Sequence, residues 1–394
     1  MSLFDKCAEV TQRLEYVKGR NQYFYCREFE PTATPFVKMA GKRLMMLGAN
    51  NYLGLSNHPK VVAAARAALE KYGTGSCSSR ILTGTSPLHV ELERRLAQFK
   101  GSEDALLYSA GFLAMMGTVS AMTGRGDVVL SDALNHASIV DGCRLSRADV
   151  RIYRHNDMTS LEEELVQARD AANRLIVTDG VFSMKGTVCN LPEIRRLADK
   201  YDAAVMIDDA HGAGALGAHG RGTAEHFGLE GKIELVCGTF SKTIASYGGF
   251  CCTRKDAVAY MRFSSRPSVF TASPPPVVAA TVLACLEVME EEPQLVEQVR
   301  RNAQFLKDGL KQAGFMLEDT ITPIIPVLVG DDERTFKVTG GLQDEGIVVN
   351  PVVPPAVPKE GSLIRVSLMS TFTLDELDQA LGKFKKVGRA VGII

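Results

Sequence analysis

Short apolar runs of strand length alternate with helical segments through the middle of the chain. Because these runs are continuously apolar instead of alternating with polar residues, they fit strands buried on both faces of a mainly parallel sheet. The predicted strands cover 105–108, 128–130, 150–153, 175–178, 203–207, 235–237 and 250–252.

The helices between these runs carry recognisable end signals. Ser86 can serve as the N-cap, Pro87 stands at the first helical position and Gly101 follows the last residue, which predicts a helix over 87–100. Further helices are expected over 58–72 and, with breaks, from Pro276 to about residue 314. The first 45 residues are expected to form a polar arm that is at least partly helical.

The C-terminal part has a different pattern. Strands are predicted over 323–329, 347–349 and 363–368, whereas 351–355 is too proline-rich for a central strand and is expected to be an ordered loop. The chain is therefore predicted to be an α/β protein with an arm (1–45), a large domain built on a mainly parallel seven-stranded sheet (46–290) and a smaller α+β domain (291–394).

Composition and charge remove several classes of protein from consideration. The 394 residues carry 45 basic and 46 acidic side chains, which gives no electrostatic reason to bind nucleic acid or an acidic membrane surface. The N-terminus lacks the features of a signal peptide, and no apolar stretch reaches the roughly 18 residues of a membrane span. The nine cysteines include no CxxC pair. We therefore expect a reduced cytoplasmic protein with no transmembrane segment and no metal site.

The run 203–207 leads into Asp208, Asp209 and His211. Two acids at a strand end can be a solvated turn, but the carboxyl ends of parallel strands are also where α/β proteins place their chemistry. The segment 212–217 then matches the dinucleotide pattern GxGxxG. The following glycines break any helix, and such a fingerprint needs a helix to begin within it, so we do not interpret this segment as a dinucleotide site.

Lys242 lies in Gly238-Thr239-Phe240-Ser241-Lys242, just after another predicted strand. It can be an ordinary loop lysine, or an amine in a partly desolvated pocket that forms a Schiff base. The hydroxyls of Thr239 and Ser241 can hold a phosphate in the second case.

Two more strand ends complete the pattern. Gly111, in Tyr108-Ser109-Ala110-Gly111-Phe112, is followed by a predicted helix whose first amides can bind phosphate. His136 lies in a polar loop and has a planar side chain able to stack. Each feature alone is common, but a phosphate loop, a stacking ring, a strand-end acid and a lysine are together the parts of a pyridoxal 5'-phosphate site.

In residues and order, these motifs resemble those of the α-oxoamine synthases, which are fold-type I pyridoxal phosphate enzymes. The resemblance runs from Asn51-Tyr52-Leu53-Gly54-Leu55 to Ile364-Arg365-Val366-Ser367. It implies that Lys242 forms the internal aldimine, that Asp208 pairs with the pyridine nitrogen, that His136 stacks on the ring, and that His211 hydrogen-bonds the phenolic oxygen with Ser183 nearby.

The resemblance also implies the remaining contacts. Gly111 and Phe112, with Thr239 and Ser241, would bind the phosphate, and Thr271 would reach the phosphate of a neighbouring subunit, which requires a homodimer. Asn51 and Arg365 would hold the substrate carboxylate, for which a guanidinium offers a two-pronged fit.

The chemistry implied by the resemblance is a decarboxylative Claisen condensation of an amino acid with an acyl thioester, carried by coenzyme A or by a carrier protein. The product is a 2-amino ketone. Motifs such as 266–273 look closest to bacterial serine palmitoyltransferases, which favours serine, a long acyl chain and a place in lipid metabolism such as sphingolipid biosynthesis.

Three other activities remain open. Glycine with acetyl-CoA, as in the 2-amino-3-ketobutyrate ligases, and alanine with a pimeloyl thioester, as in 8-amino-7-oxononanoate synthesis, use the same lysine chemistry. A fold-type I aminotransferase would also share Lys242 and Asp208. Phe372 stands where the family usually has histidine, which leaves the narrow substrate open.

Overall fold

The computed structural model describes residues 2–20, 22–31 and 35–394. Contacts within the chain divide it into two compact units. We call Asn50–Arg300 the sheet unit, and Met1–Ala49 together with Arg301–Ile394 the terminal unit. The domain limits expected from the sequence stay a prediction.

The sheet unit is built on a seven-stranded sheet of order β4-β10-β9-β8-β7-β5-β6. β10 runs antiparallel to both of its neighbours, and all the other pairs are parallel. The prediction of a mainly parallel sheet is confirmed, and every predicted strand is present, each longer or shifted by a residue or two. The strands are β4 (Asp104–Tyr108), β5 (Val128–Asp132), β6 (Asp149–Tyr153), β7 (Arg174–Asp179), β8 (Ala204–Asp208), β9 (Leu235–Thr239) and β10 (Gly249–Thr253).

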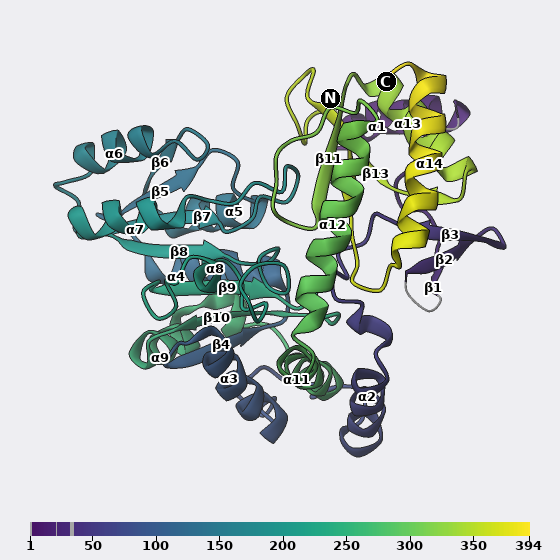
Figure 1. Cartoon of the computed structure of the whole chain (residues 1–394). Helices are drawn as coiled ribbons and strands as arrows, with labels where there is room; N and C mark the ends of the chain where they lie inside the picture. The colour runs from purple at the N-terminus through teal and green to yellow at the C-terminus, as the bar shows by residue number, and fades with distance from the viewer. Residues whose placement is uncertain (1, 21, 32–34) are drawn as a thin grey trace. The chain divides into compact units, whose positions relative to one another are not determined.

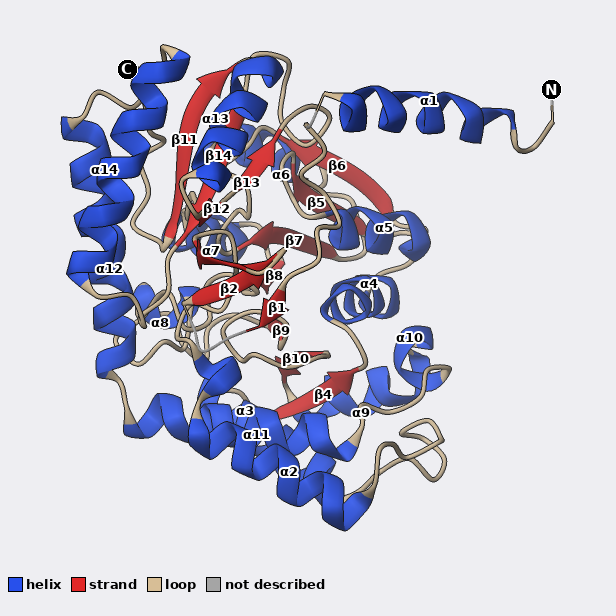
Figure 2. Cartoon of the chain, turned by 90° about the vertical axis from the view of Figure 1, so that its right-hand side faces the viewer, coloured by secondary structure: helices blue, strands red, loops and turns tan. Residues whose placement is uncertain are grey.

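Helices cover both faces of this sheet, as a parallel sheet requires. Figure 2 shows α4 and α5 on one side of the sheet and α7 on the other. The helices of the unit are η1 (Leu55–Asn57), α2 (Pro59–Tyr72), α3 (Pro87–Lys100), α4 (Gly111–Met122), α5 (Ala137–Ser146), α6 (Met158–Gln167), α7 (Leu191–Lys200), α8 (Thr223–His226), α9 (Lys255–Ser264), α10 (Arg266–Val269) and α11 (Pro276–Glu291).

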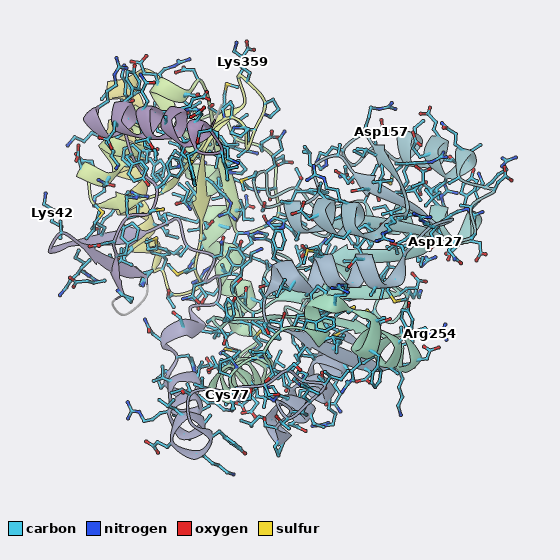
Figure 3. The ribbon with its side chains drawn as sticks, turned by 180° about the vertical axis from the view of Figure 1, so that it is seen from behind. Lys42, Cys77, Asp127, Asp157, Arg254 and Lys359 are labelled. Atoms are coloured by element: carbon cyan, nitrogen blue, oxygen red, sulfur yellow. The ribbon has the colours of Figure 1, made fainter. Side chains whose placement is uncertain are left out.

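The sequence signals explain individual helix ends. The α3 helix begins and ends where predicted, with a capping box at Ser86, Pro87 in the first turn and Gly101 at the C-cap in the left-handed conformation. Asp157 caps α6 by accepting a hydrogen bond from the amide of Ser160. Figure 3 labels Asp157, Asp127 and Arg254 at the periphery of the sheet unit.

The parallel strands of the sheet unit bring two acidic side chains to the same edge of the sheet. The middle strands β7, β8 and β9 are buried on both faces. In their parallel register Asp179 is opposite Asp208, and Asp208 is opposite Cys237. Because parallel strands end at the same edge, the two aspartates at the ends of β7 and β8 are neighbours.

The terminal unit contains two smaller sheets, a four-stranded one (order β1-β2-β3-β12) and a three-stranded one (order β11-β14-β13). Figure 1 labels β1, β2 and β3 of the first sheet and β11 and β13 of the second. α13 packs on the three-stranded sheet and against α14. The α12 helix starts in the sheet unit and ends in the terminal unit. The elements are α1 (Asp5–Gly19), β1 (Glu30–Pro31), β2 (Phe36–Met39), β3 (Lys42–Met46), α12 (Gln294–Gln312), β11 (Ile324–Gly330), α13 (Asp332–Asp344), β12 (Ile347–Val348), β13 (Asn350–Val352), β14 (Ser362–Ser367) and α14 (Leu374–Val391).

The proline-rich segment departs in part from the expectation of a loop. Residues Asn350–Val352 form β13, which pairs antiparallel with β14. β13 is an edge strand, the position in which a sheet tolerates a residue without an N–H such as Pro351. The prediction of a loop over 351–355 was therefore wrong at Pro351 and Val352.

Candidate functional site

A cavity of about 150 Å³ opens at the carboxyl edge of the large sheet. Its walls come from the start of α4, the loop before α5, the ends of β7, β8 and β9, and the loops that follow these three strands. The lining residues are Gly111, Phe112, Met115, His136, Ser138, Asp179, Val181, Ser183, Asp208, Ala210, His211, Thr239, Ser241 and Lys242. Segments far apart in the sequence are thus brought to one place by the parallel topology.

The wall made by α4 and β9 has the shape and chemistry of an anion site. α4 begins at Gly111, and no side chain caps its first amides. A Cβ at Gly111 would lie 2.5 Å from Thr239 Cβ and Oγ1, so only glycine allows this close approach. Thr239 Oγ1 and Ser241 Oγ are 2.9 Å apart and add hydroxyl groups. Amides at a helix start and nearby hydroxyls bind phosphate.

Asp208 is the buried acid of the cavity. It is the last residue of β8, its exposed fraction is 6%, and its carboxylate accepts a hydrogen bond of 3.0 Å from the amide of Ala210. Burial raises the pKa of Asp208, whereas the Lys242 ammonium and, less strongly, the Ala210 amide and His136 lower it. A buried carboxylate that ionises beside a cation is suited to pair with a protonated ring nitrogen.

His136 forms another wall. It is the N-cap of α5, and its Nδ1 lies 2.7 Å from Ser138 Oγ. Partial burial lowers the pKa of the imidazole, Asp208 raises it and Lys242 lowers it. The ring also meets the edge of Phe112, with centroids 6.2 Å apart. His136 is thus held as an uncharged planar group facing the cavity.

His211 has a partner that the sequence analysis did not assign. The hydroxyl of Tyr52, a fully buried residue, lies 2.7 Å from His211 Nδ1, and 3.3 Å from Asn50 Oδ1. A hydrogen bond at Nδ1 fixes the orientation and tautomer of an imidazole, and so determines what Nε2 can do. Tyr52 belongs to the motif 51–55, but nothing in the sequence pairs it with a histidine far along the chain.

Asp179 is a second cavity residue that the sequence analysis did not single out. It is fully buried, and it accepts a hydrogen bond of 3.3 Å from the amide of His136. Burial, and then the charge of Asp208, raise the pKa of Asp179 well above its usual range. Examination of the residue after the predicted strand 175–178 would have found it, since it ends β7 as Asp208 ends β8.

Three predicted residues do not line this cavity. Asn51 donates a hydrogen bond of 2.8 Å to Ser56 Oγ, and its Oδ1 is buried without a hydrogen-bond partner. Thr271 is partly exposed, and the carbonyl of the next residue, Ala272, accepts a hydrogen bond from Ser109. Arg365 belongs to the terminal unit, where it is buried in β14 and donates to Ser367 Oγ over 2.8 Å.

Two further sequence features have a clear structural outcome. No helix begins within the GxGxxG segment: residues 212–217 form consecutive turns, which agrees with our rejection of a dinucleotide site. Phe372, which stands at the usual histidine position of the family, is buried with an exposed fraction of 1% in the terminal unit.

The residues of the cavity fit pyridoxal phosphate. They combine an amine (Lys242), a buried carboxylate (Asp208), a planar side chain (His136), an imidazole (His211) and the phosphate cradle at Gly111. The phosphate cradle requires glycine at position 111, because a side chain there would fill it.

Comparison with known proteins agrees with this chemistry. The family model "Aminotransferase class I and II" matches residues 42–384. A serine palmitoyltransferase of Sphingobacterium spiritivorum is 46% identical over 374 residues, which are 95% of this chain and 94% of that protein. An 8-amino-7-oxononanoate synthase of Thermoanaerobacter pseudethanolicus is 40% identical over 386 residues, which are 98% of each.

Solved structures give the same result. A high-resolution structure of a serine palmitoyltransferase with pyridoxal phosphate as its internal aldimine superposes with a TM-score of 0.96, at 35% identity and over the full length of both chains. The chain therefore belongs to the α-oxoamine synthases, within the class I and II aminotransferase family. It is an enzyme, its cofactor is pyridoxal 5'-phosphate, and its fold is that of the fold-type I transferases.

No helix within 2–20, 22–31 and 35–394 is long and apolar enough to cross a membrane.

Proposed function

We propose that this enzyme condenses serine with a long-chain acyl thioester and releases carbon dioxide and the free thiol. The observation that carries this choice is the 46% identity to a serine palmitoyltransferase over nearly the whole of both chains. The organic product is a 2-amino ketone that keeps the hydroxymethyl group of serine.

The bound cofactor supplies an aldehyde that combines with amines and a cationic ring that accepts negative charge from the α-carbon of the amino acid. We propose that the Lys242 amine would hold the aldehyde of the cofactor and, with the amino acid bound in its place, would take the proton from the α-carbon. The position of Lys242 on the cavity wall, three residues beyond the end of β9, supports this role.

Asp208, His136 and His211 would each contact the ring of the cofactor and support its role as an acceptor of negative charge. Asp208 offers a buried carboxylate to the ring nitrogen, so that negative charge is stabilised as it develops. His136, uncharged and planar, covers one face. His211, oriented by Tyr52, donates to the phenolic oxygen, with Ser183 beside it on the cavity wall.

The phosphate is held at the start of α4. The amides of Gly111 and Phe112 and the hydroxyls of Thr239 and Ser241 form the cradle. Thr271 would reach the phosphate of a second copy of the chain. Exposed apolar side chains near the cavity segments support a homodimer: Phe112 on the wall is 41% exposed, and Phe270, beside Thr271, is 75% exposed.

The amino acid carboxylate is assigned to Asn51 and Arg365. Turning the Asn51 amide by 180° exchanges its Oδ1 and Nδ2, and the Ser56 hydroxyl can bond to either, so the buried atom without a partner can be an N–H donor for a carboxylate. Arg365 offers the two-pronged guanidinium. The buried guanidinium of Arg80 is not assigned this role, because it already donates hydrogen bonds of 3.0 and 2.9 Å to Glu93.

The atoms of the reaction balance without an external oxidant or reductant. The α-carbon loses its proton to Lys242 and forms a bond to the thioester carbonyl, and the thiol leaves. The carboxylate then departs as carbon dioxide, and a proton returns to the α-carbon. Lys242 finally displaces the product amine.

A second candidate is the condensation of alanine with a pimeloyl thioester. The 40% identity to an 8-amino-7-oxononanoate synthase over 98% of both chains supports it. Both reactions use the same lysine chemistry, so the cavity residues described above do not separate them.

The test is a substrate matrix with the purified holoenzyme. Glycine, alanine, serine and glutamate are each titrated while the visible absorbance of the cofactor is followed, and each is then incubated with acetyl-, pimeloyl- and palmitoyl-CoA. We expect serine with palmitoyl-CoA to give the most 2-amino ketone by mass spectrometry. A larger yield from alanine with pimeloyl-CoA would transfer the assignment to the second candidate, and acyl-independent return of the amino group to the cofactor would indicate an aminotransferase.

A further inference from the structure

The glycine-rich segment 212–222 has no part in the proposed reaction, and two of its glycines, Gly212 and Gly222, lie against the carboxylate of Asp209. A Cβ at Gly212 would overlap Asp209 Oδ1, and a Cβ at Gly222 would overlap Asp209 Oδ2. A Cβ at Gly180, in the loop after β7, would lie 3.1 Å from the same Oδ1. The backbone therefore closes around Asp209 from two loops, at positions where a side chain would not fit.

Asp209 is paired with a buried cation inside this shell. Lys100 Nζ lies 2.6 Å from Asp209 Oδ2 and also donates to the carbonyl of Arg221 over 2.6 Å. The exposed fractions of the two side chains are 3% and 1%. Thr223 donates to Asp209 Oδ1 with its amide (3.0 Å) and its hydroxyl (2.7 Å). Both oxygens of the Asp209 carboxylate thus accept hydrogen bonds, and the Lys100 ammonium has two acceptors within the protein.

The pair is attached directly to the cofactor cavity. Asp209 follows Asp208, and its backbone carbonyl accepts hydrogen bonds from the amides of Gly212 (3.2 Å) and Ala213 (3.1 Å), which closes the turn that carries Ala210 and His211. Neighbouring side chains along an extended strand point to opposite faces. Asp208 accordingly lines the cavity, whereas Asp209 is directed into the glycine shell.

We propose that the Lys100–Asp209 ion pair is a positioning device that fixes Asp208 and His211 in the cofactor cavity, and that this pair is the reason for glycine at positions 212 and 222. The inference rests on the cofactor contacts proposed above for those two residues. Lys100 and Asp209 are positioning residues, because neither lines the cavity.

The physical argument is that a buried ion pair fixes geometry more strictly than an apolar contact. Each charge must keep its partner, because an unpaired ion in this interior is strongly unfavourable. The negative charge of Asp209 also contributes to raising the pKa of Asp208, though less than burial does. The ammonium of Lys100, which contacts the Asp209 carboxylate directly, neutralises this charge.

The test uses the holoenzyme with Lys100→Met, Asp209→Asn, the double variant, and Lys100→Arg as the conservative replacement. Lys307→Met is the matched control, since Lys307 is also a buried lysine (9% exposed) and donates to the carbonyl of Thr320 within the terminal unit. The measurements are the dissociation constant of pyridoxal phosphate, the visible circular dichroism per bound cofactor, and the thermal unfolding temperature.

We expect Lys100→Met to weaken cofactor binding by about tenfold or more and to change the dichroism, because residues in one ionic network couple with energies of this order. The double variant should bind better than Lys100→Met, since no unpaired charge remains, and Lys100→Arg should retain most of the parental signal. Lys307→Met should lower only the unfolding temperature.

Unchanged cofactor binding in the Lys100 variant would overturn the proposal. If Lys100→Met lowers the unfolding temperature but leaves the cofactor affinity and the dichroism at parental values, the pair is merely structural and the proposal is overturned. Should that variant not fold, Thr223→Ala decides, because it removes the hydroxyl donor to Asp209 Oδ1, keeps the backbone amide donor and unpairs no charge. A loss of affinity of about two- to tenfold supports the proposal, and an unchanged affinity overturns it.

Asp208→Asn separates this inference from the proposed function. If Asp208→Asn leaves the cofactor signals unchanged, the assigned contact of Asp208 is wrong whatever Lys100 does. If it changes them and the Lys100 and Thr223 variants do not, only the positioning role fails.

Discussion

Replacing Tyr52 with phenylalanine tests how the site controls His211. The substitution removes one oxygen and keeps the ring, so it leaves the packing of a fully buried side chain in place. It deletes the 2.7 Å hydrogen bond to His211 Nδ1 and the weaker one, 3.3 Å, to Asn50 Oδ1. His211 Nδ1 then loses this hydrogen bond in an interior where the imidazole is only 6% exposed.

The size of the effect follows from this geometry. A hydrogen bond contributes about 0.5–1.5 kcal/mol net, and an unsatisfied buried polar group costs about 1–3 kcal/mol. If this energy serves to orient His211 toward the cofactor during the reaction, kcat/KM should fall by roughly 5- to 150-fold, since about 1.4 kcal/mol corresponds to a factor of ten. The fall should appear mainly in kcat, because Tyr52 does not line the cavity.

Tyr108→Phe provides the matched control. Tyr108 is also fully buried, and its hydroxyl donates to Ser265 Oγ over 3.0 Å, a contact that involves no cavity residue. The assay is steady-state condensation followed by thiol release, together with urea unfolding of both variants. We expect similar losses of stability but a loss of turnover only in Tyr52→Phe. If Tyr52→Phe keeps kcat/KM within about twofold of the parent while losing the same stability as Tyr108→Phe, Tyr52 fills space and does not direct His211.

Three other substitutions address the remaining parts of the site. Gly111→Ala should weaken pyridoxal phosphate binding by about tenfold or more, because the new Cβ would lie 2.5 Å from Thr239 and overpacking costs about 1–3 kcal/mol. Gly124→Ala is the control, because its Cβ would meet open space and should leave cofactor binding unchanged. If the two variants bind the cofactor equally well, the phosphate is not held at Gly111. Asp179→Asn should become more stable relative to the parental apoenzyme as pH rises above about 4. Because the pKa of Asp179 is raised, the folded parent holds this proton more tightly than the unfolded chain does, and the parent loses stability by up to about 1.4 kcal/mol per pH unit. Parallel urea-unfolding profiles of the two proteins against pH would contradict that shift. Arg365→Ala should weaken the spectroscopically measured binding of the amino acid, and Arg365→Lys should do so less, with cofactor binding unchanged; an unaltered dissociation constant in Arg365→Ala would show that another group holds the carboxylate.

The layout of the large sheet was predictable because its signals are local. A continuous apolar run predicts a buried strand, and a serine, a proline and a glycine at fixed places set the ends of α3. The predicted strands place the strand-end acid and Lys242 at the carboxyl edge by topology alone, which is why residues such as Asp208, His136 and His211 were found together around the cavity.

What the sequence did not predict depends on contacts between distant residues. The pairing of Tyr52 with His211 and of Lys100 with Asp209 joins segments more than one hundred residues apart, and no local pattern marks either pair. The segment 351–355 was predicted as a loop because proline lacks an N–H, but that rule excludes central strands and not an edge strand such as β13. The glycine-rich segment showed only that the backbone approaches other groups closely, and the structure shows that Gly212 and Gly222 approach Asp209.

The most direct test of the proposed reaction is the fate of the serine carboxylate. Holoenzyme is incubated with palmitoyl-CoA and serine labelled at the carboxyl carbon, and labelled carbon dioxide, free thiol and long-chain 2-amino ketone are measured together, with the Lys242→Ala variant in parallel. We predict that the three products form in equal amounts, that omission of the acyl thioester abolishes carbon dioxide release, and that Lys242→Ala yields none of them. If the parent releases no labelled carbon dioxide from serine, or if Lys242→Ala releases it at the parental rate, the proposed condensation at this cavity is wrong.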